Sequence, residues 1–185
     1  MKMLVALGVV AAFVVVAIGS YISVANYGNR AEKEIIYVWE NNENILSQYV
    51  QKVQEAAQVP SMQRDDLKQV VTEVMAGRYG KDGSKAVFQW IKEQNPQLDS
   101  RVYVKLQQIV EAGRDEFKTA QTSLIDAKRS YDTNLGYIWK GFWLSMAGYP
   151  KIDLSKYKAI SNDYASDAFK TGKEKGPVQL RPESR

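Results

Sequence analysis

Apolar residues fill almost the whole N-terminal stretch of the chain. After Lys2 no charged residue occurs until Arg30, and the strongly apolar part runs from Met3 to about Val24. As a helix with a rise of about 1.5 Å per residue, this part is roughly 33 Å long, whereas the hydrocarbon core of a bilayer is about 30 Å thick. The pattern therefore predicts a transmembrane anchor over residues 1–28 and a single-pass membrane protein.

Two other interpretations of this stretch stay open. Ser23 and Ala25 place small residues where a signal peptidase reads them, so a cleaved secretory signal is one alternative. The apolar run is longer than the region of about 7–15 residues found in such signals, which favours the retained anchor. A buried helix of a soluble core is the second alternative. Lys2 stands at one end and Arg30 with Lys33 at the other, so the positive charges do not decide the orientation.

Helical periodicity continues after the anchor. Residues 29–58 lack proline and glycine, and Pro60 ends this segment. Two shorter helices are predicted over 64–78 and from Ser84 to the Asn95-Pro96 step, with glycines at 77, 80 and 83 between them. The residues expected to face inward are Ile35, Ile36, Val38, Trp39, Ile45, Leu46, Tyr49, Val50, Val53, Ala56 and Ala57, then Leu67, Val70, Val71, Val74 and Met75, and finally Ala86, Val87, Trp90 and Ile91.

A cap at Asp99 or Ser100 is predicted to start the longest soluble helix. Two positions recur every seven residues through it, one with large and one with mostly small side chains. Such rows let a neighbouring helix approach closely. The large row is Val110, Phe117, Leu124, Tyr131 and Ile138, and the small row is Leu106, Gly113, Ala120, Ala127 and Asn134.

This pattern favours an antiparallel bundle of helices, and no segment shows the sustained alternation of a strand. We therefore predict an all-α fold, in which an N-terminal transmembrane helix precedes an antiparallel bundle of about four helices over residues 29–170. An intermolecular coiled coil between two copies is the alternative, because the same two rows could pair with a second chain.

The C-terminal third has a different character. Residues 137–149, YIWKGFWLSMAGY, are rich in aromatics and are followed by Pro150. One interpretation is a lid whose aromatic side chains complete the core. The other is a surface that contacts lipid headgroups or a protein, because Trp and Tyr favour such boundaries. A further amphipathic helix is predicted over Lys156–Phe169, and a disordered tail over residues 171–185, which mix charges, glycines and prolines.

The chain contains no cysteine and no histidine. This removes thiolate nucleophiles, the commonest general base and the commonest metal ligand. We therefore expect no catalytic, cofactor-binding or metal-binding residue, no cofactor and no enzyme activity. The net charge of +4 is spread over the chain and basic residues alternate with acidic ones, which disfavours a nucleic-acid partner. No small-molecule substrate is evident.

Two short patterns could suggest chemistry, and neither meets its requirements. Gly77–Lys85 is rich in glycine, but a P-loop needs a lysine directly after its last glycine, and Ser84 stands there instead. The carboxylate pairs Asp65-Asp66 and Asp115-Glu116 are adjacent in predicted helices, where neighbouring side chains point about 100° apart. We therefore expect a turn in the first case and ordinary surface carboxylates in the second.

A tryptophan-containing first helix, a basic pair before a tyrosine, and an aromatic turn with glycine follow the N-terminal span. These pieces are Val38-Trp39-Glu40 with Ile45-Leu46 and Tyr49-Val50, then Ala127–Asp132 and Leu144–Tyr149. Together they resemble the LemA family of bacterial membrane-anchored helical bundles over most of residues 1–170. The resemblance implies an anchored antiparallel bundle without an established enzymatic activity, in a bacterial inner membrane and encoded by a bacterium or a phage.

The predicted function is therefore that of a non-enzymatic single-pass membrane protein of the LemA type. Its anchor would tether a helical bundle that interacts with the membrane surface or with envelope partners. The expected partners are the lipid bilayer and either an envelope protein or a second copy of the chain. The alternative is an envelope-spanning or lysis-associated structural protein that assembles through the intermolecular coiled coil.

Overall fold

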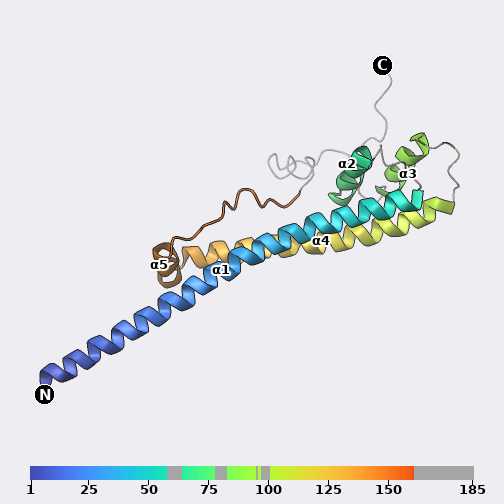
Figure 1. The fold of residues 1–185 in the computed structure, drawn as a ribbon. Helices are drawn as coiled ribbons and strands as arrows, with labels where there is room; N and C mark the ends of the chain where they lie inside the picture. Colours follow the sequence, from blue (N-terminus) through green and yellow to red (C-terminus); the bar gives the residue numbers. More distant parts are fainter. Residues whose placement is uncertain (58–63, 78–82, 95, 97–100, 161–185) are drawn as a thin grey trace, which may run out of the picture. The chain divides into compact units, whose positions relative to one another are not determined.

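The chain is helical throughout the regular part of the residues that the structure describes. In the computed structural model these are residues 1–57, 64–77, 83–94, 96 and 101–160. They contain five helices, and no strand occurs among them (Figure 1). The prediction of an all-α protein with a long apolar N-terminal helix is confirmed. The helices are α1 (Lys2–Ala57), α2 (Arg64–Met75), α3 (Gly83–Gln94), α4 (Arg101–Gly136) and α5 (Ile138–Met146).

α1 joins the predicted anchor and the first predicted soluble segment in one uninterrupted helix of 56 residues. The predicted segments 1–28 and 29–58 are therefore parts of one helix up to Ala57. Gly19 and Gly28 lie inside α1, but an internal glycine costs only about 1 kcal/mol relative to alanine and does not break a helix. No proline occurs before Pro60. The apolar run therefore continues without a break in the helix into the part of α1 that packs against other helices.

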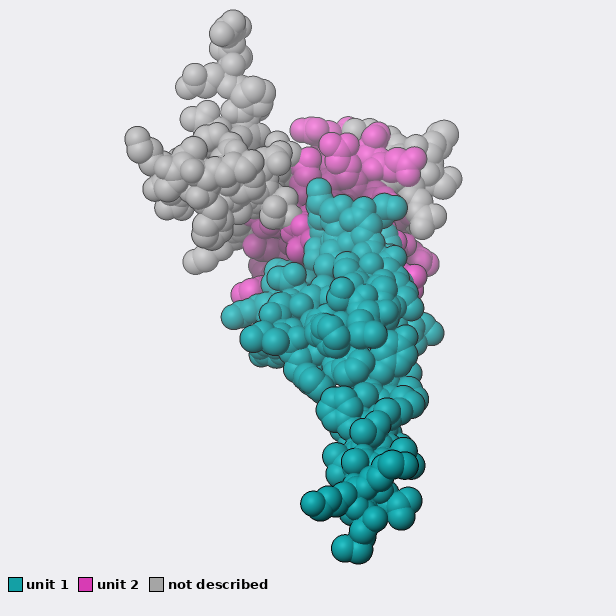
Figure 2. All heavy atoms as spheres, turned by 90° about the vertical axis from the view of Figure 1, so that its left-hand side faces the viewer, with its two compact units in different colours: residues 1–39, 123–158 teal, residues 40–122, 159–185 magenta. Residues whose placement is uncertain are grey.

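The chain divides into two compact units, which we describe separately (Figure 2). Unit 1 comprises Met1–Trp39 and Ser123–Lys158, and unit 2 comprises Glu40–Thr122 and Ala159–Arg185. Both divisions fall inside α1 and α4, so each unit contains a segment of both long helices.

Unit 2 is built around a large hydrophobic cluster to which α1, α2, α3 and α4 all contribute. Its members recur at three- and four-residue spacing, as an amphipathic helix requires. α2 ends at Met75, and Gly77 in the turn that follows has a positive φ of 85°, which is typical of a glycine that closes a helix. The inward faces predicted for this part are largely confirmed, with Ala56, Val70, Ala86 and Trp90 only half-buried. The buried members are Ile45, Leu46, Tyr49, Val50, Val53, Ala57, Leu67, Val71, Val74, Met75, Val87, Ile91, Leu106, Val110, Phe117 and Ala120.

Unit 1 has a smaller core, and it includes a charged residue. The buried apolar residues are Val24, Ile35 and Val38 from α1, Leu124 and Tyr131 from α4, and Leu144 from α5, and Glu32 is buried beside them.

The predicted row of large side chains is confirmed in part. Val110, Phe117, Leu124 and Tyr131 are all buried, whereas Ile138 is 95% exposed. α4 ends at Gly136 and α5 begins at Ile138. The seven-residue phase therefore cannot carry over to Ile138, because a new helix axis starts there.

Residues 149–160 follow α5 without forming a helix. The helix predicted over Lys156–Phe169 is therefore wrong for residues 156–160. Its remaining part lies outside the described residues, as do the predicted tail over 171–185, the caps Asp99 and Ser100, and Pro60.

Candidate membrane-facing surface

The N-terminal part of α1 exposes apolar side chains on every side. Large residues such as Met3 and Phe13 are 83% and 74% exposed, and the most apolar window of 18 residues has none of its residues buried. A water-soluble protein rarely exposes a continuous apolar patch of more than a few hundred Å². Among the described residues α1 is the one helix that is long and apolar enough to cross a membrane. The sequence-based prediction of such a helix is confirmed.

α5 is a second exposed apolar surface. Ile138, Trp139, Phe142 and Met146 are all more than half exposed, and at helical spacing they share one face. Leu144, on the opposite side of the helix, is the residue of α5 that is buried. The interpretation of this segment as a lid whose aromatics complete the core is therefore wrong for most of them. Exposure of these rings is what the alternative interpretation requires, and contact with lipid headgroups or a protein stays a prediction.

Trp143 links the aromatic side chains of α5 to α1. Its ring makes edge contacts with Trp139 at 5.5 Å and with Phe142 at 5.2 Å between centroids. It also contacts the ring of Tyr21 at 6.3 Å. The Nε1 atom of Trp143 is buried and has no acceptor among the described residues. Aromatic contacts, not hydrogen bonds, therefore hold this side chain, and they place it against the end of the apolar run.

Close packing on Gly28 fixes α5 and the turn that follows it. A Cβ atom at residue 28 would lie 2.8 Å from Leu144 Cδ2 and from Tyr149 Cε2, so only glycine allows this approach. The Tyr149 hydroxyl donates a hydrogen bond of 3.1 Å to the carbonyl of Ala25. Gly148, with φ of 76°, ends the turn after α5. Helix α5 thus contacts α1 directly over residues 21–28.

A buried carboxylate holds the segment after α5. Glu32 is 6% exposed and accepts hydrogen bonds from the Tyr131 hydroxyl at 2.7 Å, the Lys151 amide at 2.6 Å and, more weakly, the Ile152 amide at 3.4 Å. Burial, followed by this hydrogen bond, raises the pKa of the Tyr131 hydroxyl far above its ordinary value of 10. Lys128 Nζ donates to the carbonyls of Leu154 at 3.0 Å and Tyr157 at 2.6 Å.

Sequence reasoning did not identify Glu32 and Lys128 as structural residues. Glu32 belongs to none of the predicted features, and Lys128 belongs only to the basic pair of the family resemblance. A signal was present, because Glu32 lies four residues after Gly28 and three before the buried Ile35, in phase with an inward helix face. A glutamate on the inward face of a helix indicates that its carboxylate is buried and has hydrogen-bond donors in the core.

The segment that contains α5 and the residues after it, 137–158, carries a net positive charge. Lys140 Nζ lies 4.1 Å from the centre of the Tyr27 ring and donates to Asn134 Oδ1 at 2.7 Å. Residues 137–158 contain four lysines and one acidic residue, Asp153. Hydrogen bonds from the Ser155 hydroxyl and amide hold the pKa of Asp153 below its ordinary value. This part of unit 1 is therefore both aromatic and basic at neutral pH.

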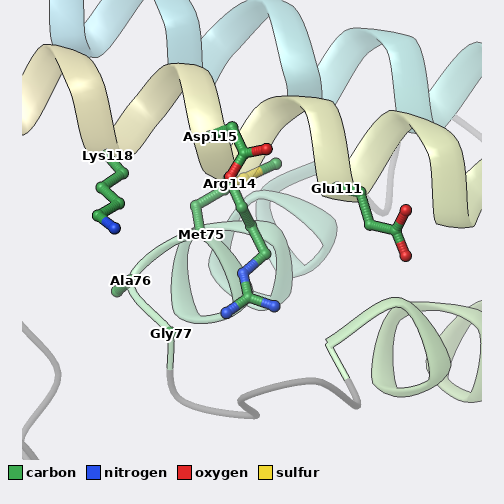
Figure 3. Close-up of a pocket in the computed structure, with 7 residues that line it drawn as sticks. All are labelled: Met75, Ala76, Gly77, Glu111, Arg114, Asp115 and Lys118. Atoms are coloured by element: carbon green, nitrogen blue, oxygen red, sulfur yellow. The ribbon is translucent and has the colours of Figure 1, made fainter.

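Unit 2 contains a surface groove of about 570 Å³ between the end of α2 and the middle of α4 (Figure 3). Two acidic and two basic side chains line it, and Figure 3 shows that Glu111 and Lys118 lie at opposite ends. Because these charges do not converge on one point, the groove offers no evident anion or cation site. Its lining residues are Met75, Ala76, Gly77, Glu111, Arg114, Asp115 and Lys118.

The short patterns considered above remain without chemistry in the described residues. A helix, α2, precedes Gly77, whereas a P-loop follows a strand, and residues 78–82 of this stretch lie outside the described residues. Glu116 accepts a hydrogen bond from the Tyr49 hydroxyl, whereas the adjacent Asp115 lines the groove. The two carboxylates therefore do not face a common site. Within the described ranges, no cluster of acidic side chains could hold a metal ion.

Comparison with models of known protein families, with characterised proteins and with solved structures gives no match. The resemblance to the LemA family therefore stays a prediction from the residues quoted above.

Proposed function

We propose that this chain is a non-enzymatic single-pass membrane protein in which the apolar part of α1 crosses the bilayer and tethers a helical bundle at its surface. The observation that carries the proposal is the exposure of the large apolar residues of α1 before Val24, in a helix whose later residues are buried. Within α1, no large apolar residue before Val24 is buried, whereas Ile35 is fully buried in unit 1. Helix α1 thus has two successive segments, of which the first is suited to contact lipid and the second to contact protein.

The tethered part is proposed to be an antiparallel bundle of the LemA type. In unit 2 Asn42 donates a hydrogen bond to the carbonyl of Ala120, and Tyr49 donates one to Glu116. A later residue of α1 is therefore paired with an earlier residue of α4, which supports opposite directions for the two segments. The resemblance to the family places such a protein in a bacterial inner membrane.

Assembly through an intermolecular coiled coil receives less support. The row of large side chains that would form its seam, including Val110, Phe117, Leu124 and Tyr131, is already buried within a single chain. Light scattering on the full chain in detergent micelles tests this alternative. A single copy per micelle supports the tethered bundle, whereas an elongated dimer favours the coiled coil and the envelope-spanning structural function.

Membrane fractionation of the full chain tests the proposal directly. We expect the protein in the carbonate-resistant pellet with its N-terminus intact. Replacing both Val10 and Val14 with Lys should release it, because each charge at the centre of a span costs about 2.5–3.5 kcal/mol. The matched control is Tyr37→Lys, at an exposed position of α1 beyond the run, which should stay in the pellet. Release of the wild-type chain by carbonate, or a mature N-terminus near Asn26, would overturn the proposal.

A further inference from the structure

We propose that α5 is a second membrane contact, lying in the headgroup boundary of the bilayer that α1 crosses. This inference rests on the proposed function, because it requires the apolar run to span a membrane. It adds a specific surface, since a tether alone would leave α5 in water. The occupant of the exposed face of α5 is then the lipid interface itself.

Distances along α1 place α5 at the correct depth. Trp143 of α5 contacts Tyr21, which is 18 residues after Met3. At about 1.5 Å per residue this separation is about 27 Å, close to the hydrocarbon thickness of about 30 Å. With Met3 at one edge of the hydrocarbon, Tyr21 and Trp143 therefore lie near the other edge.

The aromatic side of α5 faces the apolar run. Trp143 contacts α1 at Tyr21, whereas Leu144 packs on Gly28, seven residues further along α1. Seven residues of helix correspond to about 10 Å. The rings of Trp139 and Phe142 contact Trp143, so we assign them to the side of α5 that is nearer to the membrane.

The chemistry of this surface matches a lipid interface. Trp and Tyr rings concentrate at the headgroup level of membranes, where their apolar bodies and polar edges are both accommodated. The lysines of residues 137–158 outnumber the acidic residues by four to one, and anionic headgroups attract such a basic segment. A short helix with an apolar aromatic face and basic neighbours lies in the plane of the interface.

Cysteine labelling can measure this depth without interference, because the chain contains no cysteine of its own. We would place a nitroxide at Ile138→Cys in the full chain, reconstituted in vesicles of phosphatidylethanolamine and phosphatidylglycerol. Ile138 is 95% exposed, so the label should not disturb the fold. Val10→Cys, in the apolar run, and Tyr37→Cys, on the same helix beyond Tyr21, serve as the deep and the aqueous reference. Collision rates with oxygen and with a water-soluble nickel complex report the depth.

The label at residue 138 is expected to have an accessibility between the two references, near the headgroup boundary. A value equal to that of Tyr37→Cys, with Val10→Cys still deep, would overturn the role of α5 while leaving the tether intact; the exposed face would then be free for a protein partner. A value equal to that of Val10→Cys would place α5 in the hydrocarbon core and also overturn the proposal. If Val10→Cys itself is aqueous, the proposed function has failed.

Tryptophan fluorescence gives an independent measurement that does not depend on the label. A variant retaining only Trp139 (Trp39→Phe, Trp90→Phe, Trp143→Phe) should be quenched most strongly by lipids brominated near the headgroup end of the acyl chain. A control retaining only Trp39, which lies 18 residues beyond Tyr21 in α1, should be unaffected. Equal lack of quenching in both variants would contradict the interfacial position of α5.

Discussion

Units 1 and 2 each contain a tyrosine hydroxyl that donates a hydrogen bond of 2.7 Å to a glutamate, but the two pairs have different surroundings. In unit 2, Tyr49 lies at the edge of a large aliphatic cluster and its partner Glu116 is exposed. In unit 1, Glu32 is buried and also accepts the Lys151 amide. The same pair is thus peripheral in one unit and central in the other.

This difference shows two ways of holding helices together. Unit 2 is stabilised by burial of aliphatic side chains, which contributes roughly 25 cal/mol per Å² of apolar surface. Unit 1 has fewer such side chains, and it fixes a non-helical segment on α1 and α4 through Glu32 and Lys128. We therefore expect unit 2 to respond most strongly to changes in its apolar core, and unit 1 to changes in its polar contacts.

The largest expected effect is the loss of the core of unit 2. Phe117 is 2% exposed and belongs to the hydrophobic cluster. Phe117→Asp removes a large side chain and buries a charge, so we expect a loss of at least about 4 kcal/mol in unfolding free energy. Ala112→Asp, at an exposed position of α4, is the matched control. Urea titration of the full chain in micelles, followed by circular dichroism, measures both. An unchanged urea midpoint for Phe117→Asp would contradict the assignment of Phe117 to the core of unit 2.

The next largest effect is expected at Glu32. Glu32→Ala leaves the Tyr131 hydroxyl and the Lys151 amide without an acceptor, and each buried unpaired donor costs about 1–3 kcal/mol. We expect a total loss of about 2–4 kcal/mol, together with faster hydrogen exchange of residues 149–158. Glu32→Gln, which keeps an acceptor oxygen, should lose less, and Glu34→Ala, at an exposed neighbour, should stay near wild type. Unchanged exchange in Glu32→Ala would show that other contacts hold this segment.

The sequence predicts much of unit 2 and less of unit 1, and the reason lies in the range of the interactions. Leu67, Val71 and Val74 are buried as their spacing indicates, because helical periodicity is a local pattern. The burial of Glu32 depends on residues about 100 positions away, such as Tyr131 and Lys151. No local pattern specifies that pairing.

The candidate membrane-facing surface is also predictable only in part from the sequence. The apolar run is visible in the sequence alone, but its exposure in α1 is seen only in the structure, because a buried core helix has the same composition. The aromatic segment 137–149 was recognised, but its two interpretations could not be separated, since composition does not say which rings face the core. The exposure of Trp139 and Phe142 argues against the lid for those two rings, and contact with lipid or a protein stays a prediction.

One closely packed glycine in each unit allows a direct comparison of the two units, with a smaller expected effect on stability than at Phe117 or Glu32. A Cβ at Gly113 would lie 2.5 Å from Met75 Cε and 2.7 Å from Tyr49 Cδ1, and a Cβ at Gly28 would meet Leu144 and Tyr149. Overpacking typically costs about 1–3 kcal/mol, so Gly113→Ala should destabilise unit 2 and Gly28→Ala unit 1.

Gly136→Ala is the control for both glycine substitutions. No atom lies within 4 Å of the added Cβ there, and alanine in place of glycine then stabilises by about 0.4–1 kcal/mol. Hydrogen exchange of each unit locates the effect. If Gly113→Ala and Gly28→Ala stabilise the chain as much as Gly136→Ala does, helix propensity, and not close packing, sets the result.

The smallest expected effect is the pH dependence of the peripheral pair in unit 2. The hydrogen bond to Glu116, with some burial, raises the pKa of Tyr49 from 10 to about 12. The folded chain therefore keeps this proton at a pH where the unfolded chain loses it, so the stabilisation is complete below pH 10 and declines as the pH rises through about 12. Tyr49→Phe should lose about 1 kcal/mol near neutral pH.

The difference between wild type and Tyr49→Phe, and not either curve alone, isolates this titration, because lysines and other tyrosines titrate in the same range. Urea titrations from neutral pH to pH 12 should show the difference shrinking above pH 10. Glu116→Gln provides the second comparison, since it keeps an acceptor but removes the negative charge that opposes ionisation of Tyr49. The decline of its advantage over Tyr49→Phe should begin at the same pH, which the unfolded chain sets, but should end at a lower pH and be smaller than that of wild type. A difference near zero across this range would mean that Tyr49 stabilises unit 2 through its ring alone, and a constant non-zero difference would mean that folding does not raise the pKa of Tyr49.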